Sequence, residues 1–147
     1  MPFVKVYIHC VWSTKNWVDY LRTEEIRRTM WQHIHKNARK KGIFIDVVNG
    51  YSQHCHCLIS LAADQTIRKT MHLIKGESSH WFNTQNFIDE QFEWQDEYFA
   101  MSVSESMIPI VRNYILKQEQ HHRKRPFRDE YEELFEKYGF VRIKDLK

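Results

Sequence analysis

The N-terminal segment alternates between apolar and polar positions. Ile8, Cys10 and Trp12 fall on one face of this pattern, and Lys5 falls on the other. Successive side chains of a strand point to opposite faces, so the alternation predicts a half-buried strand over about residues 4–12.

A capping residue followed by acidic residues marks the first helix. Thr23 precedes Glu24 and Glu25, and Gly42 closes the segment. A threonine at the N-cap accepts a backbone hydrogen bond, and carboxylates favour the positive end of the helix dipole. The pattern therefore predicts a helix that starts at Thr23 and ends at about Lys41, before the glycine.

Further strands and helices follow along the chain. β-Branched residues predict a strand over 43–48, and Asn49-Gly50 predicts a turn into a third strand over 53–61. A second helix begins at Asp64 or Thr66. The remaining predicted elements are a hairpin of residues 92–94 and 98–103, a long helix from Ser104 or Ser106 to about His122, and a short helix over 130–138.

The order of these elements is β-α-β-β-α-β-β-α with a final helix, which predicts an α+β fold in which helices pack on an antiparallel sheet. The chain has 147 residues, 42% hydrophobic and 14% aromatic, which is enough for one core. No repeat or linker divides the sequence, so we expect a single domain over residues 1–147.

Composition excludes several classes of protein. With 28% charged residues, four glycines and three prolines, the chain is neither disordered nor collagen-like. No apolar run reaches the roughly 20 residues of a membrane helix, and Lys5 and His9 interrupt any signal-peptide pattern. Three cysteines, an odd number, argue against a disulfide framework and predict a reducing cytoplasm.

The charges are segregated along the chain, although the net charge is only +3. Basic residues gather at 39–41 and 121–128, and acidic residues gather at 129–136. This clustering fits a nucleic-acid partner and a solvated helix end equally well.

The strand over 53–61 carries the clearest chemical pattern, His54-Cys55-His56-Cys57. On a strand, His54 and His56 lie on one face, about 7 Å apart, and can coordinate one ion. Cys55 and Cys57 lie on the opposite face and point into the core. The four side chains therefore cannot surround a single tetrahedral zinc. For a His-x-His pair taken alone, two polar residues on a solvent-facing sheet remain the commoner explanation.

A second pattern lies on the long helix predicted to end at about His122. At about 100° per residue, Gln118 falls inside the apolar stripe and Tyr114 falls at its edge. The two residues are one turn apart and face the same surface. A glutamine on a buried face marks either a site or an amide bonded to the backbone. Arg112 and Lys117 lie off the stripe, free to meet solvent or phosphate.

Together these patterns resemble the single-tyrosine HUH transposases of the insertion-sequence 200/605 type. His54-Cys55-His56 matches the His-hydrophobic-His signature, and residues 113–118 match the Tyr-Ile-x-x-Gln helix of that family. Residues 118–127 continue like the related repeat-associated tyrosine transposases. The similarity covers about residues 3–140, and its minor departure is a cysteine both at the hydrophobic position, Cys55, and after the second histidine, Cys57.

The resemblance implies a ferredoxin-like (split β-α-β) fold and metal-dependent cleavage and rejoining of single-stranded DNA. Tyr114 would be the nucleophile that forms a 5′-phosphotyrosine, and His54, His56 and Gln118 would hold the metal. An open site of nitrogen and oxygen ligands favours Mg²⁺ or Mn²⁺. The resemblance also implies a bacterial or archaeal homodimer, often with the tyrosine helix completing the partner's site, and a single-stranded, hairpin-containing DNA partner. No P-loop glycine pattern occurs, so no nucleotide cofactor is expected.

Basic residues around the site are expected to contact DNA phosphates. They are Arg112, Lys117, Arg123, Lys124 and Arg125. Tyr51 and Tyr98 are weaker candidates for the nucleophile, because neither has a glutamine at helical spacing. Two other functions stay open: a non-catalytic single-stranded nucleic-acid-binding module on the same fold, and a structural zinc protein, which the strand geometry disfavours.

Overall fold

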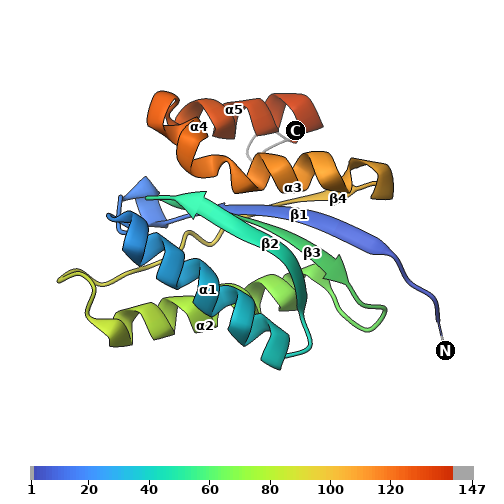
Figure 1. The fold of residues 1–147 in the computed structure, drawn as a ribbon, viewed down its shortest axis with the longest axis horizontal. Coiled ribbons are helices and arrows are strands. Elements are labelled where there is room, and N and C mark those ends of the chain that lie inside the picture. The colour runs from blue at the N-terminus through green and yellow to red at the C-terminus, as the bar shows by residue number, and fades with distance from the viewer. Residues whose placement is uncertain (1, 141–147) are drawn as a thin grey trace, which may run out of the picture.

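The computed structural model describes residues 2–140 and places an antiparallel sheet between two layers of helices (Figure 1). Helices α1 and α2 cover one face of the sheet, and α3, α4 and α5 cover the other. The strands are β1 (Val6–Ser13), β2 (Phe44–Tyr51), β3 (His54–Leu61) and β4 (Phe99–Val103). The helices are α1 (Glu24–Lys40), α2 (Ile67–Gln85), α3 (Ile108–Leu116), α4 (Gln118–Lys124) and α5 (Phe127–Tyr138). Among the described residues, no helix is long and apolar enough to cross a bilayer.

The four strands lie in the order β2-β3-β1-β4, and every neighbouring pair is antiparallel. Helix α1 connects β1 to β2, and α2 connects β3 to β4, so two β-α-β units interleave in one sheet. The predicted split β-α-β, α+β fold is therefore confirmed.

The face of the sheet under α1 and α2 holds the largest core. Ile8, Cys10 and Trp12 of β1 are buried there, together with Cys55 and Cys57 of β3. The alternation predicted for the first strand and the inward position of the two cysteines are confirmed. All three cysteines are free and buried, as the absence of a disulfide framework required.

The predicted helix ends are confirmed where a cap defines them. The side chain of Thr23 accepts a hydrogen bond from the backbone N–H of Ile26, and Gly42 takes a left-handed φ of 74° after α1. Thr66, rather than Asp64, caps α2. Gly139 ends α5 in the same left-handed conformation.

The predicted turn at Asn49-Gly50 is wrong, because both residues lie inside β2. Gly50 pairs with Cys55, and a Cβ built on it would lie 2.1 Å from the backbone oxygen of His54. The glycine serves a close backbone approach, and the chain reverses only after Tyr51. A glycine that permits close contact and one that permits a turn look the same in sequence.

The predicted hairpin of residues 92–94 with 98–103 is also wrong. β4 pairs with β1, and Trp94 forms only a single bridge, with Thr14. The reason is packing: Trp94 is buried, lies edge-on to Trp12, and donates from its indole N–H to Ser78.

The long helix predicted to end at about His122 is interrupted at Lys117, which separates α3 from α4. The side-chain amide of Asn49 donates to the backbone oxygens of Ile115 and Leu116, at 3.0 and 3.1 Å. These carbonyls are thereby capped from β2 at the point where α3 ends. The break sets the direction in which Gln118 enters the site.

Two glycines provide a matched test of the packing at the start of β3. Gly50→Ala is expected to lower the free energy of unfolding by about 1–3 kcal/mol or more, because backbone must move to admit the methyl group. Gly76→Ala, inside α2 with no neighbour within 4 Å of the new methyl, is expected to raise it by about 0.5–1 kcal/mol. Urea unfolding measures both, and equal effects of the two changes would contradict the close approach at Gly50.

Candidate active site

Polar side chains converge between the sheet and the layer formed by α3, α4 and α5. His54 and His56 come from β3, Tyr114 from α3 and Gln118 from α4. Both histidines and Gln118 are fully buried, whereas Tyr114 keeps 37% of its surface exposed. The structure therefore brings the four residues predicted from sequence into one cluster. A solvent-facing position for the two histidines is excluded by their burial.

Gln118 enters the cluster through its side-chain oxygen. Oε1 of Gln118 lies 2.9 Å from Nε2 of His54, and the ring of Tyr114 meets that of His56 edge-on at 5.6 Å. Gln118 thus breaks the apolar pattern of its helix because it has a buried polar partner.

Glu130 of α5 joins these groups, although the sequence pattern did not single it out. Its Oε1 lies 2.9 Å from Nε2 of His56 and 3.7 Å from Nε2 of His54. The hydroxyl of Tyr114 donates a hydrogen bond to Oε2 of the same carboxylate. Glu130 is 1% exposed, so a single buried carboxylate links the strand, the tyrosine and the last helix.

Three further histidines reach the cluster, and Nε2 of His121 lies 3.7 Å from Oε2 of Glu130. Nε2 of His9 lies 2.9 Å from Nδ1 of His56, and Nε2 of His122 lies 3.4 Å from Oε2 of Glu130. None of these three histidines was singled out from the sequence. The position of His122 near the site could have been predicted, because it lies one helical turn after Gln118. Glu130 could not, because it is one of several acidic residues in its helix.

Burial sets the protonation states in the cluster. It lowers the pKa of His54 well below its usual value and that of His9 to about 3, so both rings are neutral near pH 7. Burial alone would raise the pKa of Glu130, but the neighbouring His56 and His122 hold that pKa below its usual range. Burial, reinforced by the charge of Glu130, raises the pKa of Tyr114, so the phenol keeps its proton.

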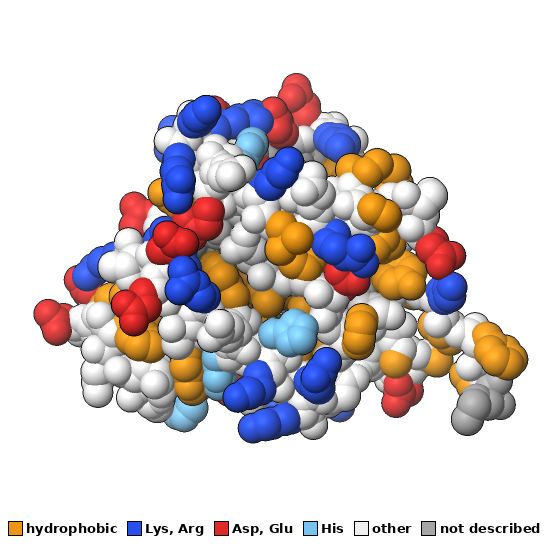
Figure 2. All heavy atoms as spheres, in the orientation of Figure 1, with side chains coloured by type: hydrophobic (Ala, Val, Ile, Leu, Met, Phe, Trp, Pro, Cys, Tyr) orange, Lys and Arg blue, Asp and Glu red, His pale blue; other side chains and the backbone are white. Residues whose placement is uncertain are grey.

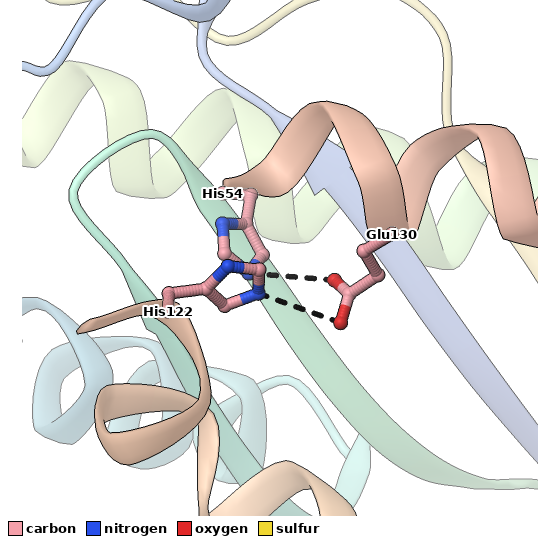
Figure 3. Close-up of side chains that lie close together, drawn as sticks. All are labelled: His54, His122 and Glu130. Atoms are coloured by element: carbon pink, nitrogen blue, oxygen red, sulfur yellow. Dashed lines mark ion pairs between the residues drawn. The ribbon is translucent and has the colours of Figure 1, made fainter. Parts of the chain in front are cut away.

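The donors of the cluster fit a divalent cation. His54, His122 and Glu130 offer ligand atoms that all lie within 4.8 Å of one another, and Figure 3 shows the two rings turned toward the carboxylate. Nε2 of His122 is buried and has no hydrogen-bond partner among residues 2–140. Neutral imidazoles and a carboxylate are common ligands of divalent metals. This group shares only His54 with the predicted set of His54, His56 and Gln118.

Comparison with known proteins places this chain in a family. The family described as "Transposase IS200 like" matches residues 3–118. This chain belongs to the IS200-like transposases. The resemblance inferred from the histidine and tyrosine motifs is thereby confirmed, and the protein is an enzyme of the DNA transposase class.

Solved transposase structures share the fold. A protein from Deinococcus radiodurans whose crystal structure is described as a "putative transposase" is 19% identical, with a TM-score of 0.65 over 80% of this chain and 93% of that one. A REP-associated tyrosine transposase bound to a REP hairpin is 18% identical, with a TM-score of 0.61 over 83% of this chain and 72% of that one. Comparison with curated proteins gives no match.

The basic residues expected to contact DNA in this transposase differ in their surroundings. Arg112 makes two hydrogen bonds to Asp46, at 2.7 and 2.8 Å, and Arg125 pairs with Glu133. Three others are exposed: Lys117, Arg123 and Lys124. Figure 2 shows Lys and Arg side chains over α4, at the upper left, and over the end of α1, at the bottom. Two of the five expected phosphate contacts are therefore already held by carboxylates.

Two glutamates of α5 test the central position of Glu130. Glu130→Ala is expected to lower the free energy of unfolding by about 1–3 kcal/mol, because the Tyr114 hydroxyl and His56 lose a buried partner. Glu133→Ala removes a surface ion pair and is expected to cost less than about 1 kcal/mol. Urea unfolding compares the two, and an equal loss in both variants would refute the structural importance of the buried carboxylate.

Proposed function

We propose that this transposase cuts and rejoins single-stranded DNA, with Tyr114 as the nucleophile. The observation that carries the proposal is the position of Tyr114 against His56 and Glu130, on the helix that precedes Gln118. Membership of the IS200-like transposase family supports the same chemistry. A tyrosine that is both partly exposed and hydrogen-bonded inside a polar cluster is placed to reach a substrate.

The proposed reaction is a transesterification. The phenolic oxygen of Tyr114 forms a bond to a DNA phosphorus atom, and the bond from phosphorus to the 3′-oxygen breaks. The phenol gives up its proton, and the departing 3′-oxygen gains one, so a 3′-hydroxyl and a 5′-phosphotyrosine result. Attack by another 3′-hydroxyl reverses the step. Because the covalent link conserves the phosphodiester energy, no nucleotide hydrolysis is required.

Glu130 prepares the nucleophile in this proposal. A free tyrosine has a pKa of about 10 and is a weak nucleophile at neutral pH, and burial raises the pKa of Tyr114 further. Oε2 of Glu130 accepts the hydrogen bond of the phenol, so it orients that oxygen. Nε2 of His56 lies 2.9 Å from the other oxygen of Glu130.

The buried donors would hold Mg²⁺ or Mn²⁺. His54, His56 and Gln118 are the proposed ligands, and His122 and Glu130 lie close enough to share the ion. A bound divalent cation polarises phosphate oxygens and stabilises charge that develops in the transition state.

The proposed DNA partner is a single strand that contains a hairpin. The REP-associated tyrosine transposase that shares this fold is bound to a REP hairpin. Lys117, Arg123 and Lys124 are exposed around the site and suit contacts to phosphate. A non-catalytic module that stacks bases on an open sheet is disfavoured, because helices cover both faces of this one.

We extend the proposal to a homodimer. Ile110 and Leu116 of α3 are 60% and 57% exposed, and an apolar pair on one short helix suits burial against a second copy. Tyr114 lies against His56 of its own chain, so we expect each subunit to use its own tyrosine.

Tyr114→Phe is expected to abolish the covalent adduct with labelled single-stranded hairpin DNA in Mn²⁺ or Mg²⁺. Phenylalanine keeps the ring and removes only the attacking oxygen, so folding and DNA binding should change little. Tyr51→Phe is the matched control and should form the adduct at the wild-type yield. A denaturing gel measures the adduct, and an undiminished yield from Tyr114→Phe would identify a different nucleophile.

His54→Ala and His56→Ala are each expected to remove cleavage, and EDTA is expected to remove it from the wild-type protein. Cys55→Val is the control from the same strand, because Cys55 faces the opposite core and valine is a similar-sized apolar residue. Cleavage of labelled DNA measures all three variants. A folded Cys55→Val that is as inactive as the histidine variants would overturn the assignment of the two faces of this strand, and full activity in EDTA would overturn the metal proposal.

A further inference from the structure

A cleft lies beside the candidate active site. It has a volume of about 1050 Å³ and opens between the end of β1, residues 95–99 and α5. Aromatic rings line it, among them Trp17, Tyr98 and Tyr131. The reaction proposed above leaves this cleft without a role.

The cleft is one ring away from the histidine cluster. Trp17 meets Phe127 edge-on at 5.5 Å, and Phe127 stacks on His54 at 4.2 Å. On the other wall, Val11 of β1 pairs directly with His56 in the sheet. A DNA strand with one phosphate at the cluster would therefore run close to the cleft.

Charge decides which part of a nucleotide the cleft can accept. Among the described residues, its lining includes the carboxylates of Asp96 and Glu97 and no lysine or arginine. Such a surface repels a phosphate but accepts hydrogen bonds from amino and imino groups. Rings and hydrogen-bond acceptors together match the face and the amino edge of a nucleobase.

The backbone that presents Trp17 is strained. Asn16 and Trp17 have φ values of 56° and 58°, a left-handed conformation that non-glycine residues rarely adopt. Each such residue costs free energy and persists only where the surroundings enforce it. The side chain of Trp17 is only half-buried, so part of its ring is accessible in the cleft.

A neighbouring hollow supplies the missing positive charge. It has a volume of about 560 Å³, shares Gln95, Asp96 and Tyr98 with the cleft, and is bordered by the exposed Arg68 and Lys69. The segment 95–98 thus separates an aromatic surface from a basic one. Single-stranded nucleic acids are commonly bound in this way, with bases on rings and phosphates on basic side chains.

We propose that the aromatic cleft binds an unpaired nucleobase of the DNA strand, next to the phosphate that is cut. The inference rests on the proposed action on single-stranded DNA. It adds a binding site that stacks a base between rings, with Trp17 as the principal contact.

The test asks whether the loss of one base and the loss of the Trp17 ring weaken DNA binding through the same contact. Single-stranded oligonucleotides with one abasic position each are compared with the intact strand by fluorescence anisotropy in EDTA, so that binding is read without cleavage. In the wild-type protein, the abasic change at one position is expected to weaken binding about tenfold or more. In Trp17→Ala that penalty should vanish, and in Trp17→Phe most of it should return.

Two controls keep the test independent of folding. Phe44→Ala removes an aromatic ring that is 58% exposed on β2, outside the cleft, and should leave the abasic penalty intact. In the unaltered protein, photocross-linking of 5-iodouracil at the same position should label the peptide that contains Trp17, Tyr98 or Tyr131. Cross-links confined to other surfaces, or an undiminished penalty in a folded Trp17→Ala, would overturn the proposal.

The outcomes also separate this inference from the proposed function. An adduct on Tyr114 without coupling at Trp17 would leave the chemistry standing and refute the base site. Coupling at Trp17 without any adduct would support the base site and refute the role of Tyr114. A changed mass of Trp17→Ala in light scattering, with the abasic penalty intact, would make the cleft an interface between copies of this chain and refute base binding.

Discussion

The carboxylate of Glu130 imposes the strongest physical constraint in the molecule, because a buried charge is tolerated only when other groups compensate it. His56 and Tyr114 hydrogen-bond to its two oxygens, and His122 approaches it from α4. These partners belong to three separate elements, so satisfying one charge fixes α3, α4 and α5 against β3. Phe127, on the same helix as Glu130, closes the cluster by stacking on His54.

This arrangement explains why the second face of the sheet is covered. Apolar residues such as Val47, Leu58 and Ile115 form a small core under α3, and a separate group around Phe99 and Phe127 lies under α5. The polar cluster lies on the same covered face. The helices are held by apolar contacts on its flanks, and the polar groups then determine how they are oriented, since each has few ways to be satisfied.

Periodic patterns in the sequence predicted the sheet, the caps of α1 and α2 and the cluster of His54, His56, Tyr114 and Gln118. These features depend on local spacing, which a strand or a helix converts directly into direction. The errors had tertiary causes. Asn49 of β2 caps the carbonyl end of α3. Trp94 does not form the predicted hairpin, because its ring packs on Trp12. Glu130 could not be singled out, because its role depends on where α5 docks.

The position of α5 along the chain divides the site into two consecutive stretches of sequence. The family match ends at residue 118, with Gln118, whereas His122, Phe127 and Glu130 all lie beyond it. The shared part thus encodes the histidine strand and the tyrosine helix, and a later segment encodes the carboxylate that contacts both. A substitution in that later segment of this chain would therefore change the surroundings of Tyr114 and His56 without changing the strand that carries the histidines. In this chain, the histidine strand and the tyrosine helix lie in one stretch of sequence, and the carboxylate that contacts both lies in the next.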